Sequence, residues 1–167
     1  MRRGVQATAA LGVLALVPLR AAIAPAAAAA CEDVEVIFAR GTLEAPGIGR
    51  TGEAFVNSLR PRIGDRTLGV YAVNYPASLD FARTADGIAD SSNRIRTVVD
   101  SCPGTQIILG GYSQGAAVNA YVTMDTIPDG VPLPPGVTET LAAEHRDRIA
   151  AVVLFGKPSA TVVGLVN

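Results

Sequence analysis

The sequence predicts an α/β protein, a three-layer sandwich built on a central parallel sheet. Four short apolar runs are rich in β-branched residues: VEVIFA (34–39), GVYAVN (69–74), QIILG (106–110) and AAVVLF (150–155). They are nearly continuous rather than alternating, which is typical of parallel strands covered on both faces. Helical stretches separate the four runs. The resulting βαβαβαβ order implies right-handed crossovers within one sheet.

Four segments fit helices: residues 52–63, 80–101, 114–124 and 137–148. The longest of them places its apolar residues near helical spacing, namely Phe81, Ile88, Ile95, Val98 and Val99. Residues 127–136 hold four of the eleven prolines, so they predict an ordered loop or flap rather than a helix. The chain stops soon after the fourth apolar run, and we expect the last part of the fold to be missing.

The first thirty residues predict a secretory signal peptide. Arg2 and Arg3 are followed by an apolar stretch and by the small-residue run AAAAA at 26–30. The stretch is too short and too rich in alanine for a stable membrane span, so we expect cleavage close to Ala30. Residues 31–167 then form one secreted domain, extracellular or associated with the cell envelope, which we expect to be a monomer. A net charge of −1 gives no reason to expect a nucleic-acid partner.

Two cysteines remain in the mature chain, Cys31 and Cys102. An even number of cysteines in an exported protein favours a disulfide. The run AAAC at 28–31 also resembles a lipoprotein cleavage site, in which Cys31 would carry a lipid and Cys102 would stay unpaired. The sequence alone leaves both alternatives open. Cysteine and histidine are not clustered with metal-ligand spacing, so we expect neither a metal nor another cofactor.

The candidate nucleophile is Ser113, within GYSQG at 111–115. This stretch fits the pattern G-x-S-x-G, with an apolar strand before it and a helix after it. A nucleophile in such a turn has unfavourable backbone dihedrals, and the residues two before and two after it come so close that only small side chains fit. A plain turn that packs a helix on a strand is the alternative. The strand-to-helix context favours a nucleophilic Ser113.

Two residues are candidates for an oxyanion hole. The backbone N–H of Gln114 starts the helix after Ser113, where a negative charge would be stabilised. The loop ARGTLEAPGIGRTG (39–52) leaves the same edge of the sheet, because parallel strands bring their carboxyl ends to one side. Thr42 in this loop could offer its N–H and its hydroxyl. A capping threonine is an equally good interpretation from spacing alone.

Four stretches together resemble the cutinase family of secreted serine esterases: ARGTLE, VNYPAS (73–78), CPGTQIILGGYSQGAAV (102–118) and VVLFGKPS (152–159). The resemblance is to the actinobacterial, cutinase-like branch and covers nearly all of residues 31–159. It implies an α/β-hydrolase fold and hydrolysis of cutin, short-chain esters or lipids. It also implies Ser113 as nucleophile, Thr42 and Gln114 as oxyanion hole, and a Cys31–Cys102 disulfide. The family's catalytic Asp and His follow the FGxP segment, and both are absent from this chain.

His145 is the only histidine, but its position argues against a catalytic role. It lies just before the fourth strand, hence at the amino edge of the sheet, whereas Ser113 lies at the carboxyl edge. A strand of five or six residues separates these edges by roughly 15–20 Å. The acids Asp125 and Asp129 are expected in turns. We therefore expect weak ester hydrolysis from this chain, because a triad without some of its members retains little of its rate.

Two other classes of function are compatible with parts of the sequence. Residues 47–52 match the dinucleotide-binding pattern G-x-G-x-x-G, but the glycines start eight residues after the strand, and Asn74 stands where a ribose-binding acid is expected. A catalytically impaired fragment or a non-enzymatic surface-binding protein on the same fold is the second alternative, because fold does not determine function.

Overall fold

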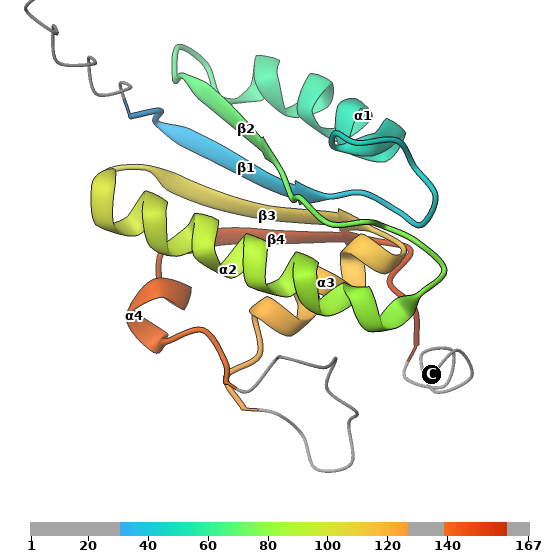
Figure 1. Cartoon of the computed structure of the whole chain (residues 1–167). Helices are drawn as coiled ribbons and strands as arrows, with labels where there is room; N and C mark the ends of the chain where they lie inside the picture. The colour runs from blue at the N-terminus through green and yellow to red at the C-terminus, as the bar shows by residue number, and fades with distance from the viewer. Residues whose placement is uncertain (1–30, 127–138, 160–167) are drawn as a thin grey trace, which may run out of the picture.

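The computed structural model describes residues 31–126 and 139–159. Its centre is a four-stranded parallel sheet in the order β2-β1-β3-β4 (Figure 1). The strands are β1 (Val34–Ala39), β2 (Leu68–Ala72), β3 (Gln106–Tyr112) and β4 (Ile149–Phe155). All four apolar runs of the sequence are therefore strands. Val34 pairs with both Leu68 and Gln106, so β1, β2 and β3 begin at the same level.

Helices cover both faces of the sheet and confirm the three-layer arrangement. Helix α1 (Gly49–Leu59), followed by a 3-10 turn (Arg60–Arg62), lies on one face. Helix α2 (Thr84–Ser101), which a 3-10 turn (Phe81–Arg83) precedes, and helix α3 (Gln114–Val122) lie on the other face (Figure 1). The short helix α4 (Ala143–Arg146) leads into β4. Each parallel connection passes through a helix, as the alternation of strand and helix predicts.

Two apolar cores hold these layers together. The larger core lies between the sheet and helices α2 and α3, with Ile37, Leu109 and Ile95 fully buried. The smaller core lies under α1, where Phe38 is fully buried and packs against Phe55 and Phe155. Strand β1 contributes alternate residues to both cores, which explains why its sequence is apolar at nearly every position.

The helix expected at residues 137–148 is much shorter than predicted. Only residues 143–146 are helical, and residues 137–138 lie outside the described ranges. Ala142 has extended dihedrals (φ −58°, ψ 147°), and Leu141 before it is buried in the larger core. The chain therefore stays extended through Ala142, next to the buried Leu141, and the helix begins only at Ala143. The proline-rich stretch 127–136 also lies outside the described residues.

The two outer strands are less covered than the sequence predicted. Every residue of β1 is buried, but no residue of β2 or β4 falls in the buried class. Val70 of β2 and Val152 of β4 are 41% and 43% exposed. Both strands lie at the edges of the described sheet, where a continuous apolar run meets fewer neighbours.

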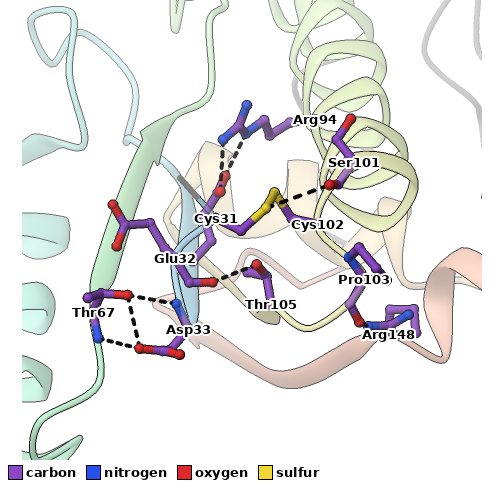
Figure 2. The surroundings of a disulfide bond; sticks show 11 residues. Cys31, Glu32, Asp33, Thr67, Arg94, Ser101, Cys102, Pro103, Thr105 and Arg148 are labelled. Carbon is purple, nitrogen blue, oxygen red and sulfur yellow. Dashed lines mark hydrogen bonds and ion pairs between the residues drawn. A yellow bond between two sulfur atoms is a disulfide. The ribbon is translucent and has the colours of Figure 1, made fainter. Parts of the chain in front are cut away.

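The disulfide between Cys31 and Cys102 ties the segment before β1 to the residue after α2, with a Cα–Cα distance of 5.5 Å (Figure 2). The Cys31 sulfur is bonded to Cys102 and is therefore not free to carry a lipid, so the disulfide alternative is confirmed. Figure 2 also shows Asp33 and Thr67 side by side: the Thr67 N–H and hydroxyl both donate to the Asp33 carboxylate, at 2.8 and 3.0 Å. These contacts join the starts of β1 and β2. Across residues 31–126 and 139–159, we find no helix with the length and apolar character of a membrane span.

Candidate active site

Ser113 occupies the turn between β3 and α3 in a strained conformation, with φ 52° and ψ −116°. A Cβ atom on Gly111 would collide with the carbonyl of Gly115, and one on Gly115 would collide with the carbonyl of Ala39. The backbone is therefore so crowded around the turn that both positions require glycine. The Ser113 N–H donates to the Phe155 carbonyl at 3.0 Å, which fixes the turn to the end of β4. Ser113 itself remains partly exposed.

Gln114 begins α3 directly after Ser113. As the first residue of the helix, it has a backbone N–H with no intrahelical acceptor, and the positive end of the helix dipole lies at the same place. Its side chain is buried and holds the neighbouring loop: the amide donates to the Ser78 carbonyl at 3.2 Å and to the Thr84 hydroxyl at 3.4 Å. The backbone N–H of Gln114 lies directly after Ser113 in the chain.

Thr42 lies beside Gln114, although 72 residues separate the two in sequence. The Thr42 hydroxyl donates to Gln114 Oε1 at 3.3 Å. Among the described residues, no acceptor is found for the Thr42 backbone N–H. The structure therefore brings together Ser113, Gln114 and Thr42, the three residues that the sequence selected. Their assignment to an oxyanion hole stays a prediction.

Arg40 and Tyr75 connect the Thr42 loop to the segment after β2, and sequence reasoning missed both. The buried Arg40 guanidinium donates to the carbonyls of Val73 (3.4 Å), Tyr75 (2.5 Å) and Glu44 (2.9 Å). The Tyr75 hydroxyl donates to the Arg40 carbonyl at 2.5 Å, and the guanidinium lies over the Tyr75 ring. Burial raises the pKa of Tyr75 well above its usual range, although Arg40 opposes the shift. Tyr75 therefore stays a neutral donor.

Asn119 is a second residue that sequence reasoning missed. It is fully buried in α3, and its amide donates to the carbonyl of Gly110 at 2.6 Å, at the end of β3. Its side-chain oxygen accepts from the Ser91 hydroxyl of α2 at 2.7 Å. A polar residue on the inner face of an otherwise apolar helix is the signal that could have indicated it. Asn119 joins α2, α3 and the strand that delivers Ser113.

His145 lies in α4, before the start of β4 and at the end of the sheet opposite to Ser113 (Figure 1). The seven residues of β3 separate the two ends by roughly 20 Å. His145 Nε2 is 3.9 Å from the Asp100 carboxylate of α2. The sequence-based placement of His145 therefore agrees with the structure.

Of the two candidate acids, Asp125 bonds to its own neighbour in the chain rather than to Ser113. The Asp125 carboxylate accepts from the N–H of the next residue, Thr126, at 2.7 Å, in a bend of the chain after α3. Asp129 lies outside the described residues. Within residues 31–126 and 139–159, no side chain bonds to Ser113 Oγ, and no group of three or more His, Cys, Asp or Glu has metal-binding geometry.

Two leucines stand exposed beside the site. Leu43 follows Thr42 and is 73% exposed, and Leu79 follows Ser78 and is 68% exposed. The Leu43 N–H donates to the Ala77 carbonyl at 2.6 Å, which brings the two loops together. The two leucines therefore expose apolar surface on neighbouring loops beside the site.

Comparisons with known proteins agree with this geometry. A family model described as Cutinase matches residues 30–165. The chain is 47% identical to phospholipase Culp4 of Mycobacterium tuberculosis over 99% of its own length, and 48% identical to carboxylesterase Culp1 of Mycobacterium bovis over 87%. It spans 71% of the length of the first relative and 61% of the second.

Solved structures of esterases share the fold. A cutinase from Trichoderma reesei, in complex with a phosphonate inhibitor, is 40% identical with a TM-score of 0.59, and the match covers 77% of this chain and 53% of that chain. The catalytic core domain of an acetyl xylan esterase from the same fungus is 28% identical with a TM-score of 0.64, covering 77% and 65%. The fold is thus that of an α/β hydrolase, as the sequence resemblance implied.

Proposed function

Because the chain belongs to the cutinase family, we propose that it is a secreted serine esterase that cleaves carboxylic esters through an acyl-enzyme on Ser113. The backbone conformation of Ser113 carries this proposal. A strained turn holds the residue at the carboxyl edge of the sheet, directly before the N-terminus of α3. Strain of this kind persists where the surrounding structure enforces it, and it is frequent at reactive residues.

In the proposed reaction, Ser113 Oγ bonds to the ester carbonyl carbon while the carbonyl oxygen gains negative charge. The backbone N–H groups of Gln114 and Thr42 hold that oxygen, and the Thr42 hydroxyl adds a third donor once its proton turns away from Gln114 Oε1. The carbon–oxygen bond to the alcohol then breaks and leaves an acyl group on Ser113, which water releases as a carboxylic acid. The Ser113 proton has to pass to a base and from there to the leaving alcohol. His145 is too far away for that role, so we expect slow turnover from residues 1–167 alone.

The nucleophile can be tested without full turnover. A fluorophosphonate probe should label the folded chain at Ser113, which peptide mass spectrometry would locate. The variant Ser113→Ala serves as the control and should give no labelled peptide. Hydrolysis of a nitrophenyl ester should be weak and should disappear in the same variant. A folded sample without labelling would instead favour a catalytically impaired fragment or a non-enzymatic surface-binding protein on this fold.

We further propose that the substrates carry an apolar acyl or alkyl chain. Leu43 and Leu79 flank the residues assigned to the oxyanion, and both expose most of their surface. Each CH₂ group of a substrate that they cover would contribute up to about 0.8 kcal/mol. Relatives named as a phospholipase and as a cutinase fit this class.

The double variant Leu43→Ser, Leu79→Ser tests the apolar rim. We expect about a tenfold loss of kcat/KM for a nitrophenyl ester of an eight-carbon acid, because the lost contacts correspond to about 1.4 kcal/mol. The acetate ester should change by less than about twofold. An equal loss for both esters would contradict an apolar subsite formed by these two residues.

We also propose that residues 1–30 are removed on export. The Cys31–Cys102 disulfide supports an oxidising compartment, since disulfides are rare in reducing ones. N-terminal sequencing of protein recovered from the culture medium should begin at or next to Cys31.

A further inference from the structure

The turn that carries Thr42 is itself strained. The Glu44 N–H donates to the Gly41 carbonyl at 3.2 Å, which closes a turn over residues 41–44. Leu43, inside this turn, has φ 62°, a left-handed conformation that is unfavourable for any residue with a Cβ atom. From outside the turn, the Leu43 N–H donates to the Ala77 carbonyl and Arg40 donates to the Glu44 carbonyl. Side-chain contacts within the loop hold its backbone further.

The Glu44 carboxylate supplies two such contacts. Its Oε2 accepts the Gly41 N–H at 2.6 Å, and its Oε1 accepts the Arg50 N–H at 3.0 Å. In the first bond Gly41 donates to Glu44, whereas in the backbone bond Glu44 donates to Gly41, so the two residues are linked in both directions. The second bond ties the turn to α1, where Arg50 is the second residue and the helix dipole favours a negative charge.

The glycine pattern at residues 47–52 makes room for this carboxylate. Gly49 has φ +68°, and a Cβ atom there would collide with both carboxylate oxygens of Glu44. Gly52 packs its bare Cα against Phe38 and Ile48. The pattern that resembles a phosphate-binding loop therefore shapes a helix N-terminus around a carboxylate of the same chain.

We infer that Glu44 is a positioning residue for the oxyanion hole: its carboxylate fixes the 41–44 turn so that the Thr42 N–H and hydroxyl lie beside Gln114. This inference rests on the proposed function, because it gives Thr42 a task in ester cleavage. Glu44 acts through the turn, since its carboxylate is engaged by Gly41 and Arg50 rather than by Thr42.

Glu44→Gln tests the role with little change in shape. An amide keeps one acceptor oxygen but turns an NH₂ group toward one of the two N–H donors. For the Ser113-dependent hydrolysis of a nitrophenyl ester, we expect kcat to fall at least about tenfold while KM stays within about twofold, because a displaced oxyanion donor costs about 10²–10³ in kcat at the limit. A kcat equal to that of the parent chain would overturn the inference.

A pair of glycine variants separates the carboxylate contact from backbone strain. Gly49→Ala and Gly64→Ala introduce a Cβ at nearly the same dihedral, φ +68° and +65°, but a Cβ on Gly64 meets nothing within 4 Å. We expect Gly49→Ala to lower kcat as Glu44→Gln does, and Gly64→Ala to leave kcat unchanged. In a Glu44→Ala background, Gly49→Ala should have no further effect on kcat. Equal kcat values for the two glycine variants would contradict a role for the carboxylate.

An NMR measurement tests the turn independently of esterase activity. The short bond to the carboxylate should move the Gly41 amide proton downfield, and Glu44→Gln should reverse that shift and also move the Thr42 amide resonance. If the parent chain shows no Ser113-dependent hydrolysis, the proposed function fails, and the resonances alone decide whether Glu44 holds the turn. Unchanged Gly41 and Thr42 resonances in Glu44→Gln would refute the inference in either case.

Discussion

Ser113 adopts its dihedrals because three backbone segments crowd around it. The glycines at 111 and 115 allow β3 and α3 to approach each other and the carbonyl of Ala39, and the Ser113 N–H is fixed to Phe155. The left-handed conformation costs about 1–3 kcal/mol for a residue with a Cβ atom. The strain at Ser113 therefore lowers the stability of the fold at the residue whose hydroxyl the proposed reaction needs at the edge of the sheet.

Ser113→Gly should consequently stabilise the protein. Glycine adopts φ 52° without the steric penalty of a Cβ, and the gain should be about 1 kcal/mol after the added flexibility of the unfolded chain is counted. Ser113→Ala keeps the Cβ and serves as the matched control, with a stability close to that of the parent. Urea unfolding followed by circular dichroism measures both. A glycine variant no more stable than the alanine variant would argue against strain at this residue.

Residue-scale prediction from the sequence succeeded for Ser113, Gln114 and Thr42 in one respect: the structure places them together. Their roles stay predictions. Gly111 and Gly115 stand at the fixed spacing that a crowded turn requires, and this spacing can be recognised in the sequence itself. Arg40 and Asn119 were missed because their partners are carbonyl groups on other strands and loops. Such long-range bonds have no local sequence pattern.

At the scale of elements, strands were easier to predict than helix ends. The run 34–39 is β1 without any shift, because burial on both faces makes a continuous apolar pattern. The helix predicted for residues 137–148 was wrong for most of its described residues, because Leu141 is buried in the core and Ala142 after it is extended. A helical pattern cannot report such a tertiary contact.

The disulfide should be the strongest single link between elements. It joins residues 71 apart, so the chain-entropy model gives a stabilisation of up to about 4 kcal/mol. The double variant Cys31→Ser, Cys102→Ser should lower the free energy of unfolding by about 2–4 kcal/mol in urea titrations. Reduction of the parent chain with dithiothreitol should have the same effect, whereas the double variant should not respond to it. A reductant response in the variant would point to another cause.

Asp33 should make the pairing of β1 and β2 sensitive to acid. Hydrogen bonds from the backbone and then the side chain of Thr67 lower the pKa of Asp33 below its ordinary value. A group whose pKa is lower in the folded state contributes stability above its unfolded pKa and loses it as the pH falls through the folded value. The parent chain should therefore lose stability below about pH 4 more steeply than Asp33→Asn. Thermal unfolding between pH 2 and 6 would measure this, and parallel curves would contradict it.

At the scale of the whole molecule, the parallel topology explains how the site assembles. Strands β1 and β3 are neighbours with Ala39 opposite Gly111, so the loops after both strands emerge at the same edge. The Thr42 turn and the Ser113 turn are thereby brought together across about 70 residues of sequence. Helix α1 holds one of them through Glu44, and Asn119 of α3 fastens the other. Every parallel α/β sheet has such a carboxyl edge, so the topology determines where the site lies. The side chains at this edge determine its chemistry.

The same sheet leaves an apolar edge at β4. Three successive residues of this strand, Ala150, Ala151 and Val152, are exposed, and β4 is the outer strand of the described sheet. An exposed apolar edge favours pairing with another chain. Strand β2 is the other outer strand, but it is shorter, and Val70 is its only residue in the exposed class.

The sequence predicts a monomer, but the exposure of β4 in the described sheet leads us to expect that residues 1–167 associate through this strand at high concentration. Val152→Lys places a charge on this edge and should shift the sedimentation profile at about 100 µM toward the monomer, because edge lysines oppose strand pairing. Val70→Lys adds the same charge to β2, at a residue of nearly equal exposure, and should leave the profile unchanged. Equal effects of the two variants would mean that net charge, rather than the β4 edge, controls association. A parent chain that stays monomeric at this concentration would show that β4 does not pair at all.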